Sequence, residues 1–328
     1  MWMATRVDIT SSGHFHQVLQ RLKISAVSED EMNNKTKGLM SVLIPVITWG
    51  ISFVSTEYLL DYMGPMSIGA VRFLIATGIL YIMMRRTGTS LKIEKKDHLL
   101  FILAGGIGIA IYFYFENTGI KYISASPAAL IIAAIPIFTL IFEALIYKRP
   151  VKAMDTLAII VSIIGVMLIV DIKIGEFFSS GESFGYVMMI GAVASWIVYS
   201  MASKPLFKRY SYLTIIFYQF FYSMPFFLIA MPFESNQWHL LGPVGIAHLI
   251  FLSLFASVLG FYYYAKAMDL LGVTESSVFI NFLPIVTIVF SYFYMGQIIS
   301  IKQLIGGLFV MLSVTVTTLH EKKLGLAN

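Results

Sequence analysis

Ten apolar runs, each bounded by charged or turn-forming residues, limit what this chain can fold into more than any other feature of its sequence. A helix that crosses the hydrocarbon core of a bilayer needs roughly 20 apolar residues, or about 17 where flanking side chains reach the interface. Lipid offers the backbone no hydrogen-bond partners, so such runs cross it as helices. The sequence therefore predicts an all-α integral membrane protein with ten transmembrane helices, at residues 39–55, 67–84, 99–115, 126–147, 157–170, 186–201, 213–231, 244–265, 277–295 and 304–318.

The composition agrees with a membrane protein. Of the 328 residues, 58% are hydrophobic and only 12% are charged, which is too few charges to cover the surface of two soluble domains. The chain has no cysteine, which excludes disulfides, a thiolate nucleophile and cysteine zinc sites. The net charge of +5 would suit a nucleic-acid partner, but the lysines and arginines are spread over loops and form no aromatic-lined groove. We therefore expect the lipid bilayer as a partner, and no nucleic acid.

The basic residues also predict how the chain is oriented. When lysines and arginines are assigned to alternate sides of the ten runs, 19 of the 23 fall on one side and three on the other, with Arg72 inside a run. Cytoplasmic loops carry such an excess of lysine and arginine. An even number of spans then places both termini in the cytoplasm, in a multi-pass protein of the cell membrane.

The two ends of the chain differ from the apolar part. Residues 1–37 hold nine charged residues and no apolar run, which predicts a disordered polar cytoplasmic tail and not a signal peptide. Two alternatives stay open: residues 15–27 form a short amphipathic helix on the membrane, or translation starts at Met32, after which a basic segment already leads into the first run. Residues 321–328 form a second cytoplasmic tail.

The apolar part contains an internal repeat. Residues 38–170 match residues 185–320 in order, at an offset of 147 to 148 positions. Five spans per copy is an odd number, so the second copy enters the membrane in the opposite sense. Inverted repeats of this kind are typical of secondary transporters, whose two halves enclose a site near the midplane of the bilayer. The matched residues include Trp49 with Trp196, Arg72 with Gln219, and Pro136 with Pro284.

Several motifs in the two copies resemble those of a known family. They are Trp-Gly-Ile-Ser-Phe at 49–53, Arg72, Tyr-Ile-Ser-Ala-Ser-Pro-Ala-Ala at 122–129 before Pro136, and Gly-Val-Thr-Glu-Ser-Ser at 272–277 before Pro284. On these residues the chain resembles the EamA-type branch of the drug/metabolite transporter superfamily, over about residues 38–320.

This resemblance implies a fold of ten helices in two inverted five-helix halves, with a central cavity lined by most helices except the fifth and the tenth. It also implies transport of small metabolites such as amino acids. The chain departs from the family at two positions: where the family usually has a glutamate after the fourth and ninth spans, it has Arg149 and Gln297. A role that rests on that glutamate pair, including coupling to an ion, is therefore not carried over.

Arg72 and Glu116 are the ionisable residues of greatest interest near the membrane interior. Arg72 lies about five residues into its run, where a charge is disfavoured by roughly 2.5 kcal/mol or more on insertion scales. Two interpretations stay open: Arg72 contacts a substrate carboxylate, to which a guanidinium is suited, or it forms a structural ion pair with Glu116. Glu116 in turn either couples proton movement to transport or is a solvated charge at a helix end.

Aromatic and polar residues at matching positions of the two copies form a candidate central substrate site. Spacing by three or four places Ser52 and Phe53 on the face of Trp49, and Tyr199 on the face of Trp196. The alternative is that these side chains only pack helices together. Neutral hydrogen-bonding groups in spans seven to nine complete the candidate set, namely Gln219, Tyr262 and Asn281.

Two prolines at matching positions, Pro136 and Pro284, lie in the middle of apolar runs and each remove a backbone hydrogen-bond donor. Kinks are therefore expected in the fourth and ninth spans. The prolines are candidate hinges for gating, with a fixed helix bend as the alternative.

Together these features predict a secondary transporter, an exporter of a small metabolite such as an amino acid, that works by alternating access around a central midplane cavity. The chain has no nucleotide-binding loop of the Gly-Lys-Ser/Thr type, no His-Glu-x-x-His pair and no Gly-x-Ser-x-Gly elbow, so an enzyme is not expected. We expect no cofactor or metal, possible coupling to protons, and a monomer, because the repeat is already fused in one chain. The alternative function is a channel or a non-transporting membrane scaffold.

Overall fold

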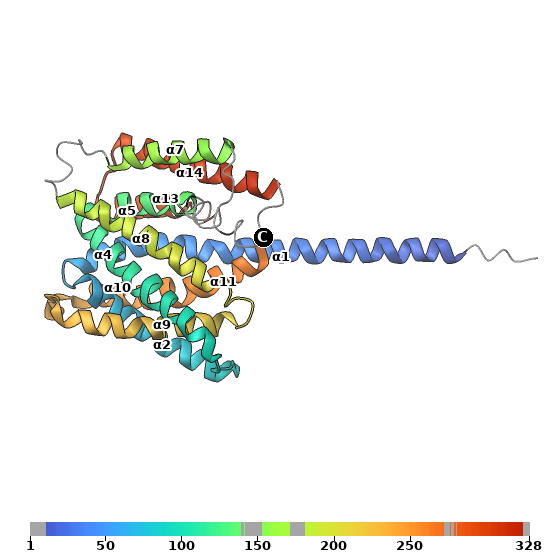
Figure 1. Ribbon diagram of the computed structural model, residues 1–328, viewed down its shortest axis with the longest axis horizontal. Coiled ribbons are helices and arrows are strands. Elements are labelled where there is room, and N and C mark those ends of the chain that lie inside the picture. Colours follow the sequence, from blue (N-terminus) through green and yellow to red (C-terminus); the bar gives the residue numbers. More distant parts are fainter. Residues whose placement is uncertain are drawn as a thin grey trace, which may run out of the picture.

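The computed structural model describes residues 11–138, 141, 153–170, 181–271, 276, 279 and 281–323, and every regular element among them is a helix. The helices gather into a bundle, from which the first part of α1 projects (Figure 1). The α-helices are α1 (Ser11–Leu60), α2 (Pro65–Thr87), α3 (His98–Ile102), α4 (Tyr112–Ile123), α5 (Ala125–Ile132), α7 (Ala153–Val170), α8 (Gly181–Ser203), α9 (Tyr212–Ala230), α10 (Gly242–Phe251), α11 (Gly260–Leu271), α13 (Leu283–Met295) and α14 (Ile301–Lys323). Shorter 3₁₀ turns are η1 (Lys95–Asp97), η3 (Met231–Phe233) and η4 (Trp238–Leu240), and π-helical segments are η2 (Leu103–Ile111) and η5 (Leu252–Leu259).

Six helical segments of the described part are long and apolar enough to cross a membrane: Lys35–Leu60, Pro65–Thr87, Lys95–Ile123, Gly181–Ser203, Tyr212–Phe233 and Gly242–Leu271. Shorter apolar helices overlap the other four predicted runs, at Ala125–Phe138, Thr156–Ile169, Leu283–Met295 and Ile301–Val316. The prediction of an all-helical membrane protein is therefore confirmed for the described part. Portions of the fourth and ninth runs, together with Arg149, lie outside it.

Large apolar side chains cover much of the outside of the bundle. Met167, Ile229 and Phe293, from three different helices, are 67%, 69% and 80% exposed. A surface of this kind would favour aggregation in water. In a bilayer the same side chains contact lipid tails, so the outward faces of the helices agree with a membrane protein.

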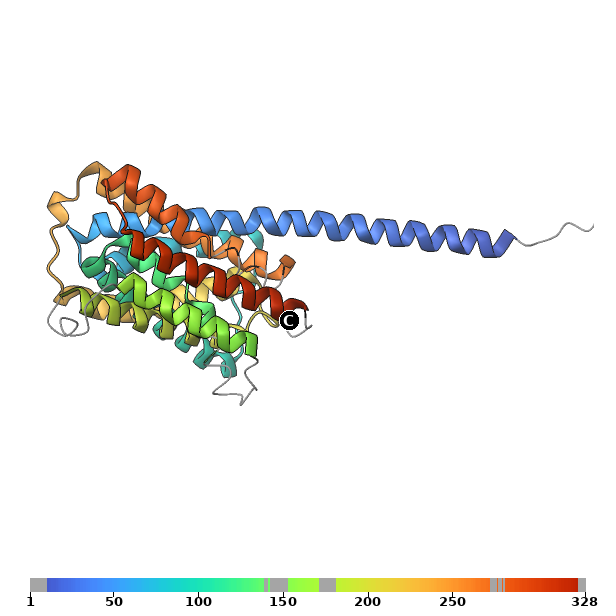
Figure 2. The same ribbon diagram turned by 90° about the horizontal axis from the view of Figure 1, so that it is seen from above.

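Helix α1 continues well beyond its membrane-length segment. It begins at Ser11 and runs to Leu60, so residues 11–34 precede the segment Lys35–Leu60 as a helix that projects from the bundle (Figures 1 and 2). Over residues 11–37 the structure has this helix where the composition predicts a disordered tail, and residues 1–10 lie outside the described part. The physical reason is that adding a residue to an existing helix costs much less than nucleating a new one.

Helices α7 and α14 lie side by side at one edge of the bundle (Figures 1 and 2) and approach each other at two glycines. A Cβ atom added to Gly306 of α14 would lie 2.5 Å from the carbonyl oxygen of Gly165 in α7, and the reverse substitution is equally tight at 2.6 Å. Small residues let helix backbones come close together in membranes. The close approach therefore depends on both glycines.

Gly306→Ala is expected to lower the melting temperature of the detergent-solubilised protein. The new Cβ must displace the backbone of α7, at a cost of about 1–3 kcal/mol. Gly78→Ala in α2 is the matched control, because its Cβ would meet nothing within 4 Å and alanine stabilises a helix by up to about 1 kcal/mol relative to glycine. Thermal unfolding of both variants checks this, and a melting temperature of Gly306→Ala at or above that of the wild type would contradict the close contact.

A polar cluster holds the loop after α2 against the loop before α9. Arg209 and Tyr210 both donate hydrogen bonds to the carboxylate of Asp97, and the Tyr210 hydroxyl also accepts one from the backbone N–H of Glu94 at 2.9 Å. The hydrogen bond to Asp97 raises the pKa of Arg209, and burial raises the pKa of Tyr210. On the predicted orientation these loops lie on the cytoplasmic side, where they connect the two halves.

The π-helical segments η2 and η5 interrupt spans three and eight at matching places. They lie between α3 and α4 and between α10 and α11, so that each belongs to one long apolar segment, Lys95–Ile123 or Gly242–Leu271. Their positions differ by about the offset that relates the two sequence copies. A π turn contains one residue more than an α turn and is frequent at functional sites. Of the two, η5 holds two candidate site residues, because Ala256 and Ser257 accept hydrogen bonds from Trp49 and Arg72.

The sequence predicts that Pro136 and Pro284 lie in the middle of spans four and nine. In the structure each of them lies near the start of a helical segment instead. Pro284 is in the first turn of α13, directly after a turn at 281–282, and Pro136 follows a turn at 133–134 that ends α5. Proline is tolerated in a first helical turn because its missing N–H has no partner there. Both spans are therefore broken near these prolines, and a role of the prolines as hinges stays a prediction.

Candidate functional site

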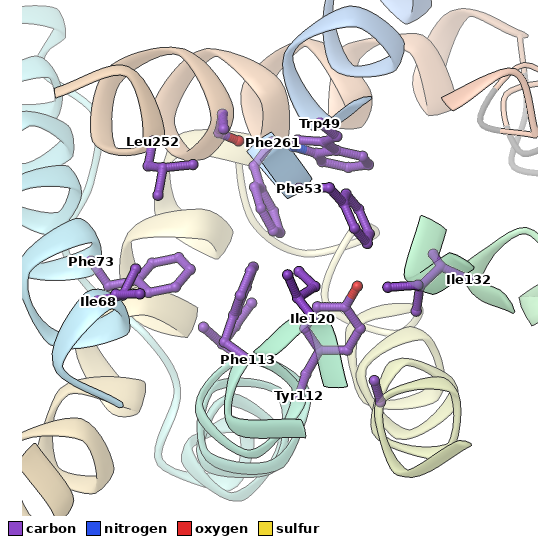
Figure 3. Close-up of a cluster of buried hydrophobic side chains, with 14 of the residues drawn as sticks. Trp49, Phe53, Ile68, Phe73, Tyr112, Phe113, Ile120, Ile132, Leu252 and Phe261 are labelled. Atoms are coloured by element: carbon purple, nitrogen blue, oxygen red, sulfur yellow. Dashed lines mark hydrogen bonds between the residues drawn. The ribbon is translucent and has the colours of Figure 1, made fainter. Parts of the chain in front are cut away.

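The centre of the bundle is filled by aromatic side chains from four helices. Trp49 of α1 contacts Trp196 of α8 edge to face, with ring centroids 6.1 Å apart. Phe261 of α11 lies 5.2 Å from Trp49, and Tyr112 of α4 lies 5.2 Å from Trp196. Figure 3 shows Trp49, Phe53, Phe261 and Tyr112 pointing into the same space between the helices. The structure therefore brings together the tryptophans that occupy matching positions in the two sequence copies.

Trp49 is held in place by η5. Its indole Nε1 donates a hydrogen bond to the carbonyl oxygen of Ala256 at 2.8 Å. Phe53, one turn along α1, is buried in the same cluster. Ser52 is buried nearby, but its hydroxyl donates to the carbonyl oxygen of Trp49 at 2.7 Å. Ser52 therefore uses its one donor within α1, and only its acceptor capacity is left for a ligand.

Arg72 lies inside the bundle with 2% of its surface exposed. Its Nε donates to Ser257 Oγ in η5 at 2.6 Å, and its guanidinium carbon lies 4.5 Å from the ring centroid of Phe113. Cation–π contacts contribute about 2 kcal/mol or more where water is excluded. No ion pair within 4.0 Å joins Arg72 and Glu116, although the structure describes both residues. The structural ion pair considered from the sequence is therefore not formed, and no described residue accepts a hydrogen bond from the two Nη groups.

Glu116 is buried as well, with 6% of its surface exposed, and its Oε1 accepts a hydrogen bond from the Tyr112 hydroxyl at 2.6 Å. The sequence places the end of span three at residue 115, which would leave Glu116 near water. That boundary was wrong, because α4 continues to Ile123. Gly119 of α4 and Gly185 of α8 let the two helices pack closely enough to extend the span. Glu116 is therefore an interior carboxylate and not a solvated helix end.

A neutral polar group occupies the position that matches Arg72 in the second copy. Gln219 of α9 is fully buried, and its Nε2 donates to Ser203 Oγ at 2.9 Å. Its Oε1 accepts from the Tyr199 hydroxyl at 3.2 Å, and the Tyr199 ring lies 4.9 Å from Trp196. Trp196, Tyr199 and Gln219 therefore form one contact group next to the aromatic centre.

In span eight the sequence predicts Tyr262 as a substrate contact, but other residues of this span contact the aromatic centre. Tyr262 contacts the neighbouring Tyr263 ring at 5.4 Å, whereas Phe261 and Tyr264 contact Trp49, at 5.2 and 5.1 Å. Sequence reasoning selected Tyr262 for its hydroxyl and missed the other two. That choice did not consider the helix face, which η5 rotates by adding a residue to a turn just before α11.

Asn281 lies at the break that precedes α13. Its Nδ2 is buried and has no hydrogen-bond partner among the described residues. A buried donor left without a partner costs about 1–3 kcal/mol. The break in span nine therefore presents an amide that a ligand could satisfy.

A separate cavity of about 670 Å³ is lined by none of the ten predicted substrate contacts. Its wall includes Glu57, near the end of α1. Glu57 Oε1 accepts a hydrogen bond from Gln297 Nε2 at 2.6 Å, and Glu57 Oε2 accepts one from the backbone N–H of Ala125 at 2.8 Å. The sequence singled out Gln297 only because the family usually has glutamate there. It gave no sign of Glu57, a single acid that follows a predicted run.

The sequence model of one family matches the chain twice, over residues 36–171 and residues 183–319. The chain belongs to the EamA-like transporter family. The resemblance drawn from the sequence motifs is therefore confirmed, and the two matches fall on the two copies of the repeat. As a member of this family, the protein is a membrane transporter and not an enzyme.

The EamA-like transporter is similar to other transporters along most of its length. An uncharacterized transporter of Archaeoglobus fulgidus is 25% identical over 297 residues, which cover 88% of this chain and 99% of the relative. The uncharacterized transporter YyaM of Bacillus subtilis is 27% identical over 269 residues, 81% of this chain and 88% of YyaM. A probable terminal-alkyne amino-acid exporter of Streptantibioticus cattleyicolor is 24% identical over 272 residues, 83% and 90% of the two chains. A crystal structure that is 17% identical, with a TM-score of 0.62, covers 89% of this chain and 99% of its own, which shows a shared fold.

Proposed function

We propose that this EamA-like transporter is a secondary transporter that exports a small metabolite such as an amino acid across the cell membrane. In this proposal ten transmembrane helices form two inverted five-helix halves with both termini in the cytoplasm, and a central site is exposed to each side in turn. The double family match and the matching positions of η2 and η5 support the two-half arrangement. The protein works as a monomer, because both halves are present in one chain.

The observation that carries the proposal is a pair of buried ionisable groups, Arg72 and Glu116, with no direct ion pair within 4.0 Å between them. Charged groups are rarely buried unless they are paired. Arg72 makes one hydrogen bond, through Nε, and its two Nη groups have no described acceptor. A substrate carboxylate is well matched to that guanidinium fork. The rings of Trp49 and Trp196 lie in the same centre and suit an apolar or aromatic substrate side chain.

Glu116 gives the site a way to respond to protons. When ionised, it contributes the negative charge that would attract the ammonium group of an amino acid bound through Arg72. When Glu116 is protonated, it loses that attraction. Protonation of Glu116 and binding of the substrate therefore oppose each other. Competition of this kind couples inward proton movement to outward substrate movement, as intramembrane carboxylates do in other transporters. The name of the Streptantibioticus cattleyicolor relative supports an amino acid as the exported class.

Counterflow in proteoliposomes tests the proposal. Vesicles that contain the purified full-length protein are loaded with one unlabelled amino acid, and the labelled form is added outside. A transporter accumulates the label transiently above its equilibrium level, whereas a channel does not. Ion conductance without counterflow would support the alternative function of a channel, and the absence of both activities for every amino acid would favour a non-transporting scaffold.

A further inference from the structure

The cavity beside the end of α1 is lined by charged residues that have no part in the central site. Among the described residues, its lining carries three carboxylates, from Glu57, Asp61 and Glu182, and one ammonium group, from Lys121. The volume of about 670 Å³ lies within the range of roughly 300–1,000 Å³ that is common for small-molecule sites. The cavity is therefore large enough for a small organic ligand, and its lining favours a cation.

Glu57 provides an anion that no protein cation neutralises. The structure places no lysine, arginine or histidine nitrogen of the described residues within 4.0 Å of its carboxylate. Both hydrogen bonds that it accepts come from neutral donors, the Gln297 amide and the Ala125 backbone. Gln297 is itself fixed, because its Oε1 accepts from the Ser291 hydroxyl at 2.6 Å. The carboxylate is thus held in one orientation with its charge and further lone pairs available.

Ser126 gives an independent indication of a ligand in the same cavity. It is only 6% exposed, it lines the cavity, and its hydroxyl forms no hydrogen bond with the part of the chain that the structure describes. Because Ser126 lines the cavity, its hydroxyl is available there to hydrogen-bond a ligand.

The backbone next to Ser126 adopts an energetically unfavourable conformation. Ser124 has φ 67° and ψ 172°, a region in which residues other than glycine are rare. This conformation separates α4 from α5 and allows the first N–H of α5, that of Ala125, to donate to Glu57. Backbone strain of this kind is concentrated at ligand sites and switches.

We propose that this cavity binds the ammonium group of a small aliphatic amine, with the Glu57 carboxylate as its counter-charge and the Ser126 hydroxyl as a hydrogen-bond acceptor. The described lining residues include two more carboxylates than ammonium groups, so a diamine with two positive charges matches them best. The proposal does not depend on the transport function proposed above, because none of the predicted central residues lines the cavity. It concerns a second site, which on the predicted orientation faces the outside of the cell.

Calorimetric titration of the full-length protein in detergent tests the proposal with three four-carbon probes that differ only in charge. We expect saturable binding of 1,4-diaminobutane, which weakens as salt is added. We expect no measurable binding of the neutral 1,4-butanediol or the dianion succinate. Equal binding of the diol and the diamine would overturn the proposal, as would the absence of any binding of the diamine.

Variants assign the binding to this cavity. Glu57→Gln keeps the shape of the side chain and removes its charge, and we expect diamine binding to weaken by about tenfold or more. Glu94→Gln, an exposed glutamate on a loop elsewhere, is the matched control and should bind as the wild type does. Lys121→Gln removes the like charge from the lining and should tighten binding by roughly threefold. A gain in affinity cannot result from misfolding, so unchanged affinity in both Glu57→Gln and Lys121→Gln would disprove the assignment.

One further variant distinguishes binding at the central site from binding in this cavity. Arg72→Gln should lose counterflow and still bind 1,4-diaminobutane with unchanged affinity. If counterflow fails in the wild type while the diamine binds and depends on Glu57, the transport proposal falls and the amine site stands. If diamine binding is lost in Arg72→Gln but kept in Glu57→Gln, the amine binds at the central site and this inference is wrong.

Discussion

Arg72→Gln is expected to reduce amino-acid counterflow by roughly 10- to 150-fold. Glutamine fits the buried position, but it cannot offer a charged fork to a carboxylate. A hydrogen bond to a charged group contributes about 1.5–3 kcal/mol, and each 1.4 kcal/mol corresponds to about a tenfold change in binding. The loss should be seen as a higher concentration of amino acid for half-maximal exchange in proteoliposomes.

Two further variants show whether this loss is due to recognition. Arg72→Lys keeps the charge but not the planar fork, so its counterflow should lie between those of wild type and Arg72→Gln. Ser257→Ala removes the partner of Nε and leaves both Nη groups, so it should retain most of the activity. Melting temperatures identify any variant that fails to fold. Wild-type exchange in a folded Arg72→Gln protein would mean that Arg72 only packs against Phe113 and Phe73.

Glu116→Gln is expected to abolish the response of efflux to an inward proton gradient. Glutamine imitates the protonated carboxylic acid and cannot change its charge, so substrate and proton no longer compete. Exchange without a gradient should persist at reduced affinity, because the contact with the substrate ammonium is weakened and the contact with Arg72 remains. The measurement compares efflux from proteoliposomes with and without an imposed pH difference.

Tyr112→Phe tests the neighbouring group, since it removes the hydroxyl that donates to Glu116 and leaves the ring contact with Trp196. It should alter the pH dependence of efflux and keep the gradient response itself. The exposed Glu94→Gln should behave as the wild type does in both assays. A Glu116→Gln protein that still responds fully to the proton gradient would rule out Glu116 as the coupling group.

Most of the membrane architecture follows from the sequence because hydrocarbon imposes a simple rule. Within the described residues every predicted run overlaps a helical segment, since an apolar stretch in lipid has to satisfy its backbone internally. Boundaries were harder to predict where polar residues stay inside. Span three reaches Ile123 through Glu116 and Asn117, because these residues find partners or close helix contacts that hydropathy alone does not describe.

The candidate site was predicted in part, and one of the differences has a local cause in span eight. Repeat matching found Trp49 and Trp196, which do meet, because a repeat keeps equivalent residues on equivalent faces. It did not find Phe261 and Tyr264, since no residue pattern announces that η5 departs from α-helical geometry. Glu57 was missed because its importance depends on Ala125 and Gln297, which are distant in sequence.

Because of the π-helical segments, the loss of a single residue in a relative of this protein would change which side chains face the centre. Each residue of an α-helix turns the chain by about 100°. A relative that lacks one residue within η5 and has a regular α-helix there would still cross the membrane with a span of nearly the same length. Its side chains beyond the gap, however, would be rotated by about that angle, and a residue such as Tyr262 would face the centre in place of Phe261. Two family members could therefore share almost every residue of this span and still present different side chains to their substrates.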